Sequence, residues 1–301
     1  MSTLCAAFLT MLTLAAVTEA LPSQTFVSST GNDANDCTQS TPCRTFAGAV
    51  PKTGAKGIIT ALDSSSYGIV TIDKALTLQA APGVYAVLEG GRTDDVVTIN
   101  AGATSVVALR NLQIMTRSLA ANNGVTVSNV GTLHVENCVI KGFGGAGLNG
   151  PVSCNANDDV RRVFLLDSIF RDNVIGVTTH CAKALADHCR FDHNHTGLYV
   201  SSVTQMTVRD CVLDGNSDVG LNVAISGIAM VENCVVSNNG TGIQGDQFQA
   251  GVSVTYVSST MIFSNVMGLL PKGGLMFSFG NNRLAFNTTD GSFTPGPIPQ
   301  Q

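Results

Sequence analysis

The feature that most constrains this chain is a repeat that returns every 21 to 30 residues between residues 112 and 282. The copy that begins at Gly220 reads GLNVAISGIAMVENCVVSNNGTGI. With Cys138 as the reference position, the equivalent residues are Leu112, Ser168, Cys189, Cys211, Cys234, Thr260 and Asn282. A repeat of this length indicates a solenoid, in which each copy forms one coil that stacks on the next.

The pattern inside each copy indicates which solenoid forms. An apolar residue stands two positions after the reference, and a Gly-aliphatic pair such as Gly197-Leu198 opens the next apolar run. These runs are short and alternate in polarity, which is typical of strands and not of helices. Five positions after the reference the chain repeatedly has Asn, at Asn173, Asn194, Asn216, Asn239, Asn265 and Asn287.

The residue just before the reference predicts a tight corner between the second and third strands of each coil. Asn and Asp tolerate the left-handed backbone region that such a corner requires. Side chains stacked on successive coils can also hydrogen-bond to one another. The corner residues are Asn111, Asn137, Asp167, His188, Asp210, Asn233, Ser259 and Asn281.

With these features, residues 25–287 resemble the right-handed parallel β-helix superfamily, which includes pectate lyases and secreted bacterial β-helix repeat proteins. The resemblance implies an all-β, single-domain, right-handed parallel β-helix solenoid with three short strands per coil. It also implies a small N-terminal cap helix, which we place near Arg44–Val50. A cap is needed because an open sheet end would pair with another chain.

We expect four segments along the chain. Residues 1–20 are apolar and end in small residues, which predicts a signal peptide and hence a secreted, periplasmic or cell-surface protein. Residues 21–57 are expected to form the N-terminal cap, and residues 58–287 the β-helix. Residues 288–301 contain Pro295, Pro297 and Pro299 and are expected to be either a flexible tail or a cover for the last coil.

Composition argues against several kinds of partner. The formal net charge is -5, and the chain has no Lys/Arg cluster beyond Arg161-Arg162, so no nucleic-acid-binding surface is visible. The apolar stretch in residues 1–20 is too short to span a membrane comfortably. No glycine-rich loop has the context of a phosphate site. Nothing in the sequence indicates an oligomeric state.

The nine cysteines fall into different groups. Cys37 and Cys43 flank a proline-containing loop, and we predict that they form a small disulfide. Cys154, in a long loop, and Cys181, on the next coil, are predicted to form another, because neighbouring coils lie about 4.8 Å apart. The repeat stacks the remaining cysteines of the solenoid as a ladder of buried thiols; a zinc site there would need inward-facing His or carboxylate groups that the pattern does not supply. These four are Cys138, Cys189, Cys211 and Cys234.

Outward positions on the first strand of each coil predict a polysaccharide-binding face. Amides, hydroxyls and one aromatic ring there suit a hydroxyl-rich glycan, although solvent-facing strands can simply be polar. The positions are Thr126, Asn149, Thr178, Tyr199, Asn222 and Gln244. On the third strand the outward positions are mainly apolar, which predicts either a partner surface or a strip covered by a terminal segment. They are Val139, Ile169, Arg190, Val212 and Val235.

Loops beside the first strand would add Asp158 and Arg161 as substrate-binding residues. His193 and His195 have a spacing that suits a metal or a general base, but His193 equally fits a surface turn and His188 the corner stack. If the protein is an enzyme, the candidate acid and base groups are His180, His195, Tyr199 and Asp218.

The resemblance implies calcium held by acidic residues in lyases and paired carboxylates in glycosidases. This chain has no stacked Asp trio on the first strand, and only Glu89, Glu136 and Glu232 follow residue 20. We therefore expect no metal or other cofactor, with calcium supported by analogy alone. Two hypotheses remain: a secreted protein that binds polysaccharide on the first-strand face, or a polysaccharide lyase, hydrolase or epimerase.

Overall fold

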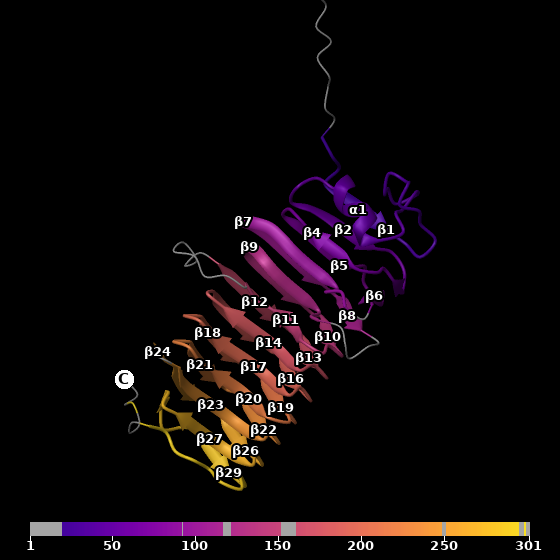
Figure 1. Ribbon diagram of the computed structural model, residues 1–301. Coiled ribbons are helices and arrows are strands. Elements are labelled where there is room, and N and C mark those ends of the chain that lie inside the picture. The colour runs from indigo at the N-terminus through magenta and orange to yellow at the C-terminus, as the bar shows by residue number, and fades with distance from the viewer. Residues whose placement is uncertain are drawn as a thin grey trace, which may run out of the picture.

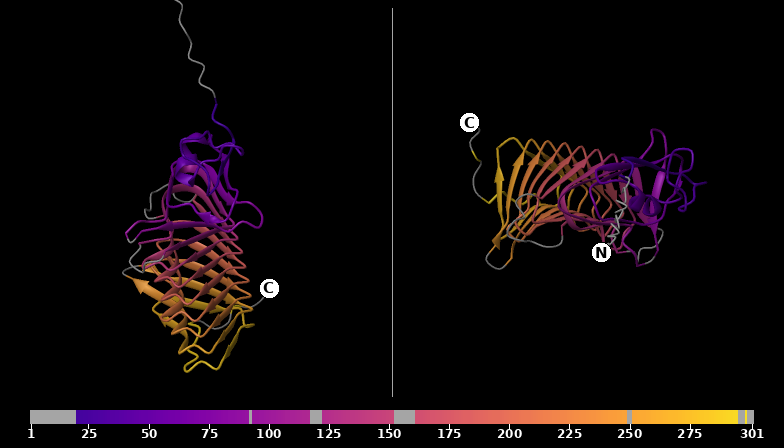
Figure 2. Two further views of the ribbon diagram at one scale, coloured as in Figure 1. Left: turned by 90° about the vertical axis from the view of Figure 1, so that its right-hand side faces the viewer. Right: turned by 90° about the horizontal axis from the view of Figure 1, so that it is seen from above.

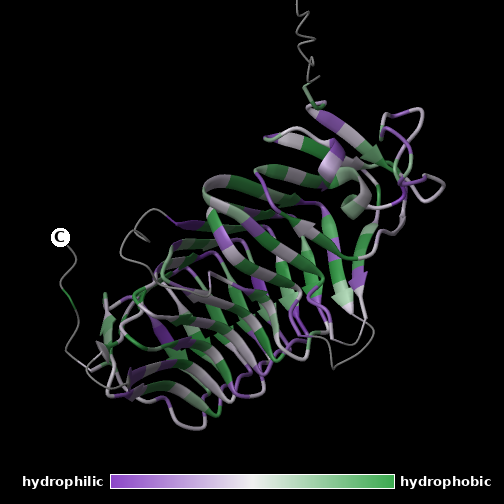
Figure 3. Ribbon diagram, turned by 45° about the horizontal axis from the view of Figure 1, so that its top comes forward, coloured by the Kyte–Doolittle hydropathy of each residue, from purple (hydrophilic) through white to green (hydrophobic). Residues whose placement is uncertain are grey.

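The computed structural model describes residues 20–91, 93–116, 122–151, 161–248, 251–294 and 298. The chain winds into a parallel β-helix whose coils stack from the N-terminal to the C-terminal end (Figures 1 and 2). Three sheets run along the stack and are called first, second and third after the order of their strands in each coil. Alternate residues of the strands are apolar and line the interior (Figure 3). The expected all-β solenoid is confirmed.

The first sheet consists of β4 (Val70–Ile72), the beginnings of β7 (Val97–Arg110) and β9 (Val125–Glu136), β11 (Ala146–Asn149), β14 (Ile175–His180), β17 (Thr196–Ser201), β20 (Val219–Val223), β23 (Thr241–Phe248) and β27 (Met267–Lys272). The second sheet consists of β1 (Gln24–Val27), β2 (Gly57–Ala61), β5 (Leu76–Ala80), the ends of β7 and β9, β12 (Arg162–Leu166), β15 (Lys183–Asp187), β18 (Gln205–Arg209), β21 (Ile228–Glu232), β25 (Val254–Ser258) and β28 (Leu275–Ser278). The third sheet consists of β3 (Ser65–Ser66), β6 (Ala86–Gly90), β8 (Leu112–Thr116), β10 (Val139–Lys141), β13 (Ile169–Arg171), β16 (Arg190–Asp192), β19 (Val212–Asp214), β22 (Val235–Ser237), β26 (Met261–Phe263) and β29 (Arg283–Ala285). A short strand, β24 (Gly251–Val252), pairs antiparallel with the end of β23.

Two coils depart from three separate strands. In β7 and β9 the first and second strands are continuous, so these elements are 14 and 12 residues long. The pairing of β7 with β9 shifts register between Ile99 and Val106, where the chain turns from the first sheet to the second. Such irregularities let a strand bend without ending.

The N-terminal cap contains β1, a one-turn helix α1 (Phe46–Ala49) and a 3-10 turn η1 (Val50–Lys52). The helix lies where the sequence predicts it. Thr45 caps it by accepting a hydrogen bond from the Gly48 amide at 2.9 Å. Strand β1 pairs in parallel with β2, so the cap continues the second sheet. The disulfide between Cys37 and Cys43 is present, as predicted.

The predicted corner residues adopt the left-handed backbone conformation. Seven of the eight have a positive φ between 49° and 57°: Asn111, Asn137, Asp167, His188, Asp210, Asn233 and Ser259. A second left-handed position, four residues after the reference, turns the chain from the third sheet into the first. It is occupied by Gly142, Asp172, His193, Gly215, Asn238, Ser264 and Phe286. His188 and His193 therefore serve as turn residues, and each has an imidazole that is 65% exposed.

The continuous hydrogen-bonded ladder runs through the buried Asn residues five positions after the reference, and not through the corner residues. Each ladder Asn from Asn173 to Asn265 donates its side-chain amide to the Oδ1 of the next, at 2.8 to 3.2 Å. The corner stack shows only separate pairs, such as Asn137 with Asn111 at 2.8 Å. The corner side chains are exposed, where water competes for their hydrogen bonds.

The ladder explains the Gly-aliphatic pair. A Cβ at Gly197 would lie 2.6 Å from the Gly220 carbonyl oxygen and 3.0 Å from Asn216 Nδ2. Equivalent crowding occurs at Gly147, Gly176, Gly220, Gly242 and Gly268. Each coil therefore needs a residue without a side chain where it passes the ladder of the next coil.

The four repeat cysteines are buried and free, as expected for a stack of small side chains. The Cys189 amide donates to Cys211 Sγ at 3.4 Å, which links successive coils. Burial raises the pKa of the Cys138 thiol to about 12. Cys181 is also disulfide-bonded, but its predicted partner Cys154 lies outside the described residues, so the pairing stays a prediction.

The described part of the C-terminal segment covers two sheets of the last coil. The Gly268 amide donates to the Thr289 carbonyl at 2.8 Å, and the Thr294 amide donates to the Met276 carbonyl at 3.0 Å. The described residues of this segment therefore lie against the last coil. These contacts lie on the first and second sheets, and the apolar residues of the third-sheet strip stay half-exposed. No helix in the described ranges is long and apolar enough to cross a membrane.

Candidate functional site

The outward residues of the first sheet form one row along the solenoid. Strand pairing places Asn149, Thr178, Tyr199, Asn222 and Gln244 next to one another on successive coils. Neighbouring side chains in such a row lie about 4.8 Å apart. The structure thus brings together the first-strand residues that the sequence singles out.

A second row of polar side chains lies two residues further along the same strands. It contains His180, Ser201 and Asp246. His180 bonds on both sides: its Nε2 is 3.1 Å from Thr178 Oγ1, and its Nδ1 is 2.8 Å from Ser201 Oγ. Burial lowers the pKa of His180, so the ring is neutral at pH 7.

Tyr199 and Gln244 are both influenced by Asp246. Burial raises the pKa of the Tyr199 phenol, and the negative charge of Asp246 adds to the effect. Gln244 donates its side-chain amide to Asp246 Oδ2 at 2.9 Å. Thr178, His180, Tyr199, Ser201, Asn222, Gln244 and Asp246 are called the first-sheet cluster below.

Several residues of the first-sheet cluster have little exposed surface although they point away from the core. Thr178 is 6% exposed, Gln244 7% and Ser201 fully buried. The buried Oδ1 of Asn222 has no hydrogen-bond partner among the described residues. A buried amide oxygen without a partner is costly, which favours a ligand or water that donates to it.

His195 and Asp218 lie apart from this cluster. His195 Nε2 is 3.7 Å from Asp218 Oδ2, and both side chains are more than half exposed. Because Thr196 pairs with Ile175, His195 is level with residue 174, six residues before His180. Six residues of strand span about 20 Å. The four candidate acid and base groups therefore lie in two separate places, with His180 and Tyr199 in the cluster and His195 and Asp218 outside it.

The loop candidates are only partly described. Asp158 lies outside the described residues. Arg161 is 5% exposed and directly precedes β12, at the turn from the first sheet to the second.

The donor set of the first-sheet cluster does not fit calcium. Calcium binds six to eight oxygen ligands, usually including several carboxylates. Asp246 is the one carboxylate of the cluster, and it is hydrogen-bonded to Gln244. In the described chain, Asp187, His188 and Asp210 also place potential metal ligands close together. There, however, Asp187 already forms an ion pair with Arg209, in which Nη2 of Arg209 lies 2.6 Å from Oδ2 of Asp187.

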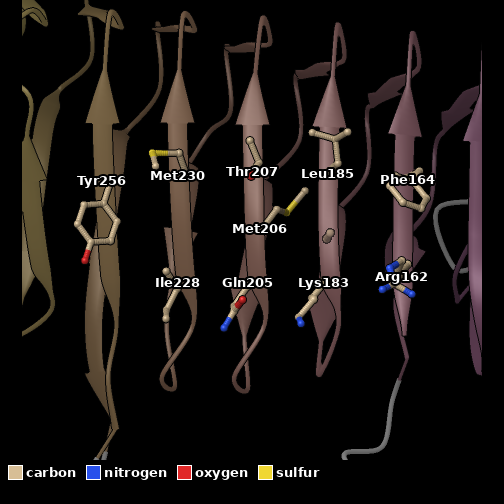
Figure 4. Close-up of a pocket in the computed structure, with 11 residues that line it drawn as sticks. Arg162, Phe164, Lys183, Leu185, Gln205, Met206, Thr207, Ile228, Met230 and Tyr256 are labelled. Carbon is tan, nitrogen blue, oxygen red and sulfur yellow. The ribbon is translucent and has the colours of Figure 1, made fainter. Parts of the chain in front are cut away.

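A groove on the second sheet is the part of the surface that the sequence interpretation missed. It crosses β12, β15, β18, β21 and β25 and has a volume of about 390 Å³. Figure 4 shows its outward side chains in two parallel rows. The central row is Phe164, Leu185, Thr207, Met230 and Tyr256, and the flanking row begins with Arg162, Lys183, Gln205 and Ile228. These positions share no residue type, so no repeat signal marks them.

Comparison with known proteins agrees with this architecture. The fold is similar to that of the pectate lyase Pel9A, with a TM-score of 0.54 and 13% identity over 85% of this chain and 67% of that one. It is equally similar to an alginate lyase from Paenibacillus sp. str. FPU-7, with a TM-score of 0.54 and 13% identity over 88% of this chain and 97% of that one. At such identity the likeness concerns the fold.

No curated protein sequence matches the chain. The family model described as "Right handed beta helix region" matches residues 97–288, which is most of the solenoid. Since that match covers more than half of the sequence, the chain belongs to the right-handed β-helix family.

Proposed function

We propose that this protein is exported and binds a polysaccharide on its first sheet, at the first-sheet cluster. The observation that carries the proposal is the row of polar side chains Thr178, Tyr199, Asn222 and Gln244, repeated at the spacing of the coils. A polymer of sugars also presents similar groups at regular intervals. A chain lying along the solenoid would meet the same kind of contact on each coil.

The chemistry of the row suits sugar hydroxyls. Amides and hydroxyls both donate and accept hydrogen bonds, as sugar hydroxyls do. The buried Oδ1 of Asn222 has no partner among the described residues, so a sugar hydroxyl or a bridging water that reached it would gain a hydrogen bond. Tyr199 adds an aromatic ring with a polar tip, a combination that contacts the apolar face of a sugar as well as its hydroxyls.

The same contacts favour binding over proton abstraction. Both ring nitrogens of His180 are engaged by hydroxyls, so neither is available as a base without rearrangement. The raised pKa of Tyr199 keeps its phenol protonated. A base that works near neutral pH needs a pKa close to the operating pH. The phenol of Tyr199 does not meet that requirement.

Export is supported by two observations. Residues 1–20 have the composition of a signal peptide. The Cys37–Cys43 disulfide supports export because disulfides persist mainly in oxidising compartments. The fold's likeness to a pectate lyase and an alginate lyase supports a polysaccharide as the ligand.

The experiment is affinity electrophoresis of the mature protein in gels that contain pectate, alginate or a neutral glucan. We expect retardation by at least one polymer, and we expect Tyr199→Ala and Asn222→Ala to weaken it at least about tenfold. Tyr85→Ala is the matched control, because Tyr85 is 50% exposed and lies far along the chain from the cluster. Wild-type retardation of both cluster variants would refute the site.

The same polymers, incubated with the protein, should be followed for unsaturated products and new reducing ends. Binding without turnover is the expected result. Turnover that Tyr199→Phe abolishes would establish the enzyme hypothesis instead.

A further inference from the structure

We propose that the groove on the second sheet is a separate binding site for an acidic polysaccharide. The groove lies on different strands from the first-sheet cluster but on the same coils. It does not depend on the first-sheet proposal being correct. The ligand class follows from the charge, the apolar surface and the polar centre of the groove.

The charge of the groove is opposite to that of the protein. The chain has a formal net charge of -5. Among the described residues that line the groove, Arg162 and Lys183 are basic and none is acidic. These two are paired neighbours in register on β12 and β15, and both are exposed. Two adjacent cations on an acidic protein favour an anionic ligand.

The central row offers an apolar floor along the solenoid axis. The ring of Phe164 stacks on His134 at 4.9 Å, and the ring of Tyr256 stacks on Phe277 at 5.2 Å. Leu185, Thr207 and Met230 lie between Phe164 and Tyr256 in this row (Figure 4). Met230 is 39% exposed. Exposed apolar surface of this kind often marks a binding site. The apolar C–H faces of sugar rings can rest on such a floor.

The centre of the groove is polar, which distinguishes a glycan from other occupants. Gln205 and Thr207 lie on β18, the middle strand of the five (Figure 4). Interfaces between proteins have an apolar centre and a polar rim. A lipid chain would leave the Gln205 amide without partners. A sugar chain instead provides hydroxyls for Gln205 and Thr207.

The geometry also fits a polymer better than a single sugar. The lined strands span five coils, or about 19 Å along the axis at 4.8 Å per coil. Carboxylates carried by successive sugars would meet Arg162 and Lys183 at one end, and Tyr256 would contact a sugar ring at the other. Because both cations are exposed, their contribution falls as salt rises.

The test measures pectate and alginate affinity for the full mature chain at low and high salt, with a neutral glucan alongside. Arg162→Glu and Lys183→Glu should weaken binding of the anionic polymers by at least about tenfold and remove its salt dependence. Binding of the neutral glucan should not change. Arg283→Glu, on β29 of the third sheet, makes the same charge change away from the groove and should bind as wild type.

The first-sheet site and the groove can be distinguished by combining variants. With Tyr199→Ala, a salt-sensitive affinity for the anionic polymers should remain, and adding Arg162→Glu should remove it. Unchanged affinity of both groove variants would overturn the proposal, as would equal losses in Arg283→Glu. If the groove variants keep their affinity but change molecular mass in light scattering, the groove is a contact between copies of the chain and the glycan proposal is wrong.

Discussion

Asn194 donates its side-chain amide to Asn216 Oδ1 at 3.2 Å, and the Asn194 backbone amide donates to the same oxygen at 3.0 Å. Asn216 in turn donates to the Phe191 carbonyl at 2.9 Å and to Asn239 Oδ1 at 2.8 Å. One buried side chain thus joins three coils. The stability of the solenoid should depend on this ladder more than on the exposed corners that the repeat also displays.

Replacing Asn216 with Ala should lower the free energy of unfolding by about 3 kcal/mol, because it leaves buried donors and acceptors on two coils unsatisfied. Urea denaturation followed by circular dichroism measures the loss. Asn233→Gly is the control: Gly keeps the left-handed corner and removes only an exposed hydrogen bond to Asp210. Its cost should stay below about 1 kcal/mol. Equal losses in both variants would show that the ladder has no special role.

Gly197→Ala should destabilise the protein by about 3 kcal/mol, because the new methyl group would overlap the Gly220 carbonyl of the next coil. Gly83→Ala separates this crowding from backbone strain. Gly83 has a φ of 77° and nothing within 4 Å of an added Cβ, so its cost should be about 1 kcal/mol. A thermal shift as large for Gly83→Ala as for Gly197→Ala would contradict the explanation by crowding.

These positions show why the fold was predictable from the sequence. In a solenoid each residue contacts its equivalent on the next coil, so a spatial stack is also a sequence repeat. The Asn ladder, its glycine partners and the buried cysteines all follow that rule. The corner residues follow it as well, but their exposed side chains bond only in pairs, which the residue types alone do not reveal.

The candidate surfaces were less predictable. Tyr199 and Asn222 could be aligned because they follow the conspicuous Gly-aliphatic pair. His195 and His180 are close in sequence but belong to opposite ends of neighbouring strands, and only the register of Thr196 with Ile175 separates them. The groove is built from unlike residues, such as Phe164 and Thr207, at equivalent positions. A function spread over unlike residues produces no repeat.

Acid should destabilise the N-terminal cap through Asp63. Burial opposes ionisation of this carboxylate, but hydrogen bonds from Tyr67, Ser29 and Ser28 outweigh it and lower its pKa to about 2, from 3.8. Because the folded-state pKa is the lower one, the stabilisation is present above pH 3.8 and is lost as the pH falls toward 2. Asp63→Asn should therefore be less stable than wild type at pH 5, with the difference shrinking between pH 4 and pH 2.

Thermal denaturation across that pH range measures the effect of Asp63. Asp73→Asn provides the matched control, since Asp73 is exposed in the short segment between β4 and β5. It should change stability little at any pH, because isolated surface charges contribute little. A constant difference between Asp63→Asn and wild type from pH 5 to pH 2 would contradict the role of the ionised carboxylate.

Alkylation should separate the cysteines into two classes. All four stacked thiols are buried, so iodoacetamide cannot reach them in the folded protein. For Cys138, burial also raises the pKa to about 12, which makes its reactive thiolate scarce. Iodoacetamide at pH 8 should label none of them until the chain is unfolded. When the chain is unfolded without reductant and alkylated, mass mapping should find label on Cys138, Cys189, Cys211 and Cys234.

The same map tests the disulfides. Cys37 and Cys43 should stay unlabelled and appear in one cross-linked peptide. Cys181 should be cross-linked to Cys154, the partner that the stacking of neighbouring coils predicts. Reduction before unfolding should release all four thiols and lower stability, since each cross-link restricts the unfolded chain. Label on Cys154 without reductant would refute that pairing, whereas label on the stacked thiols in the folded state would show that the coils open locally.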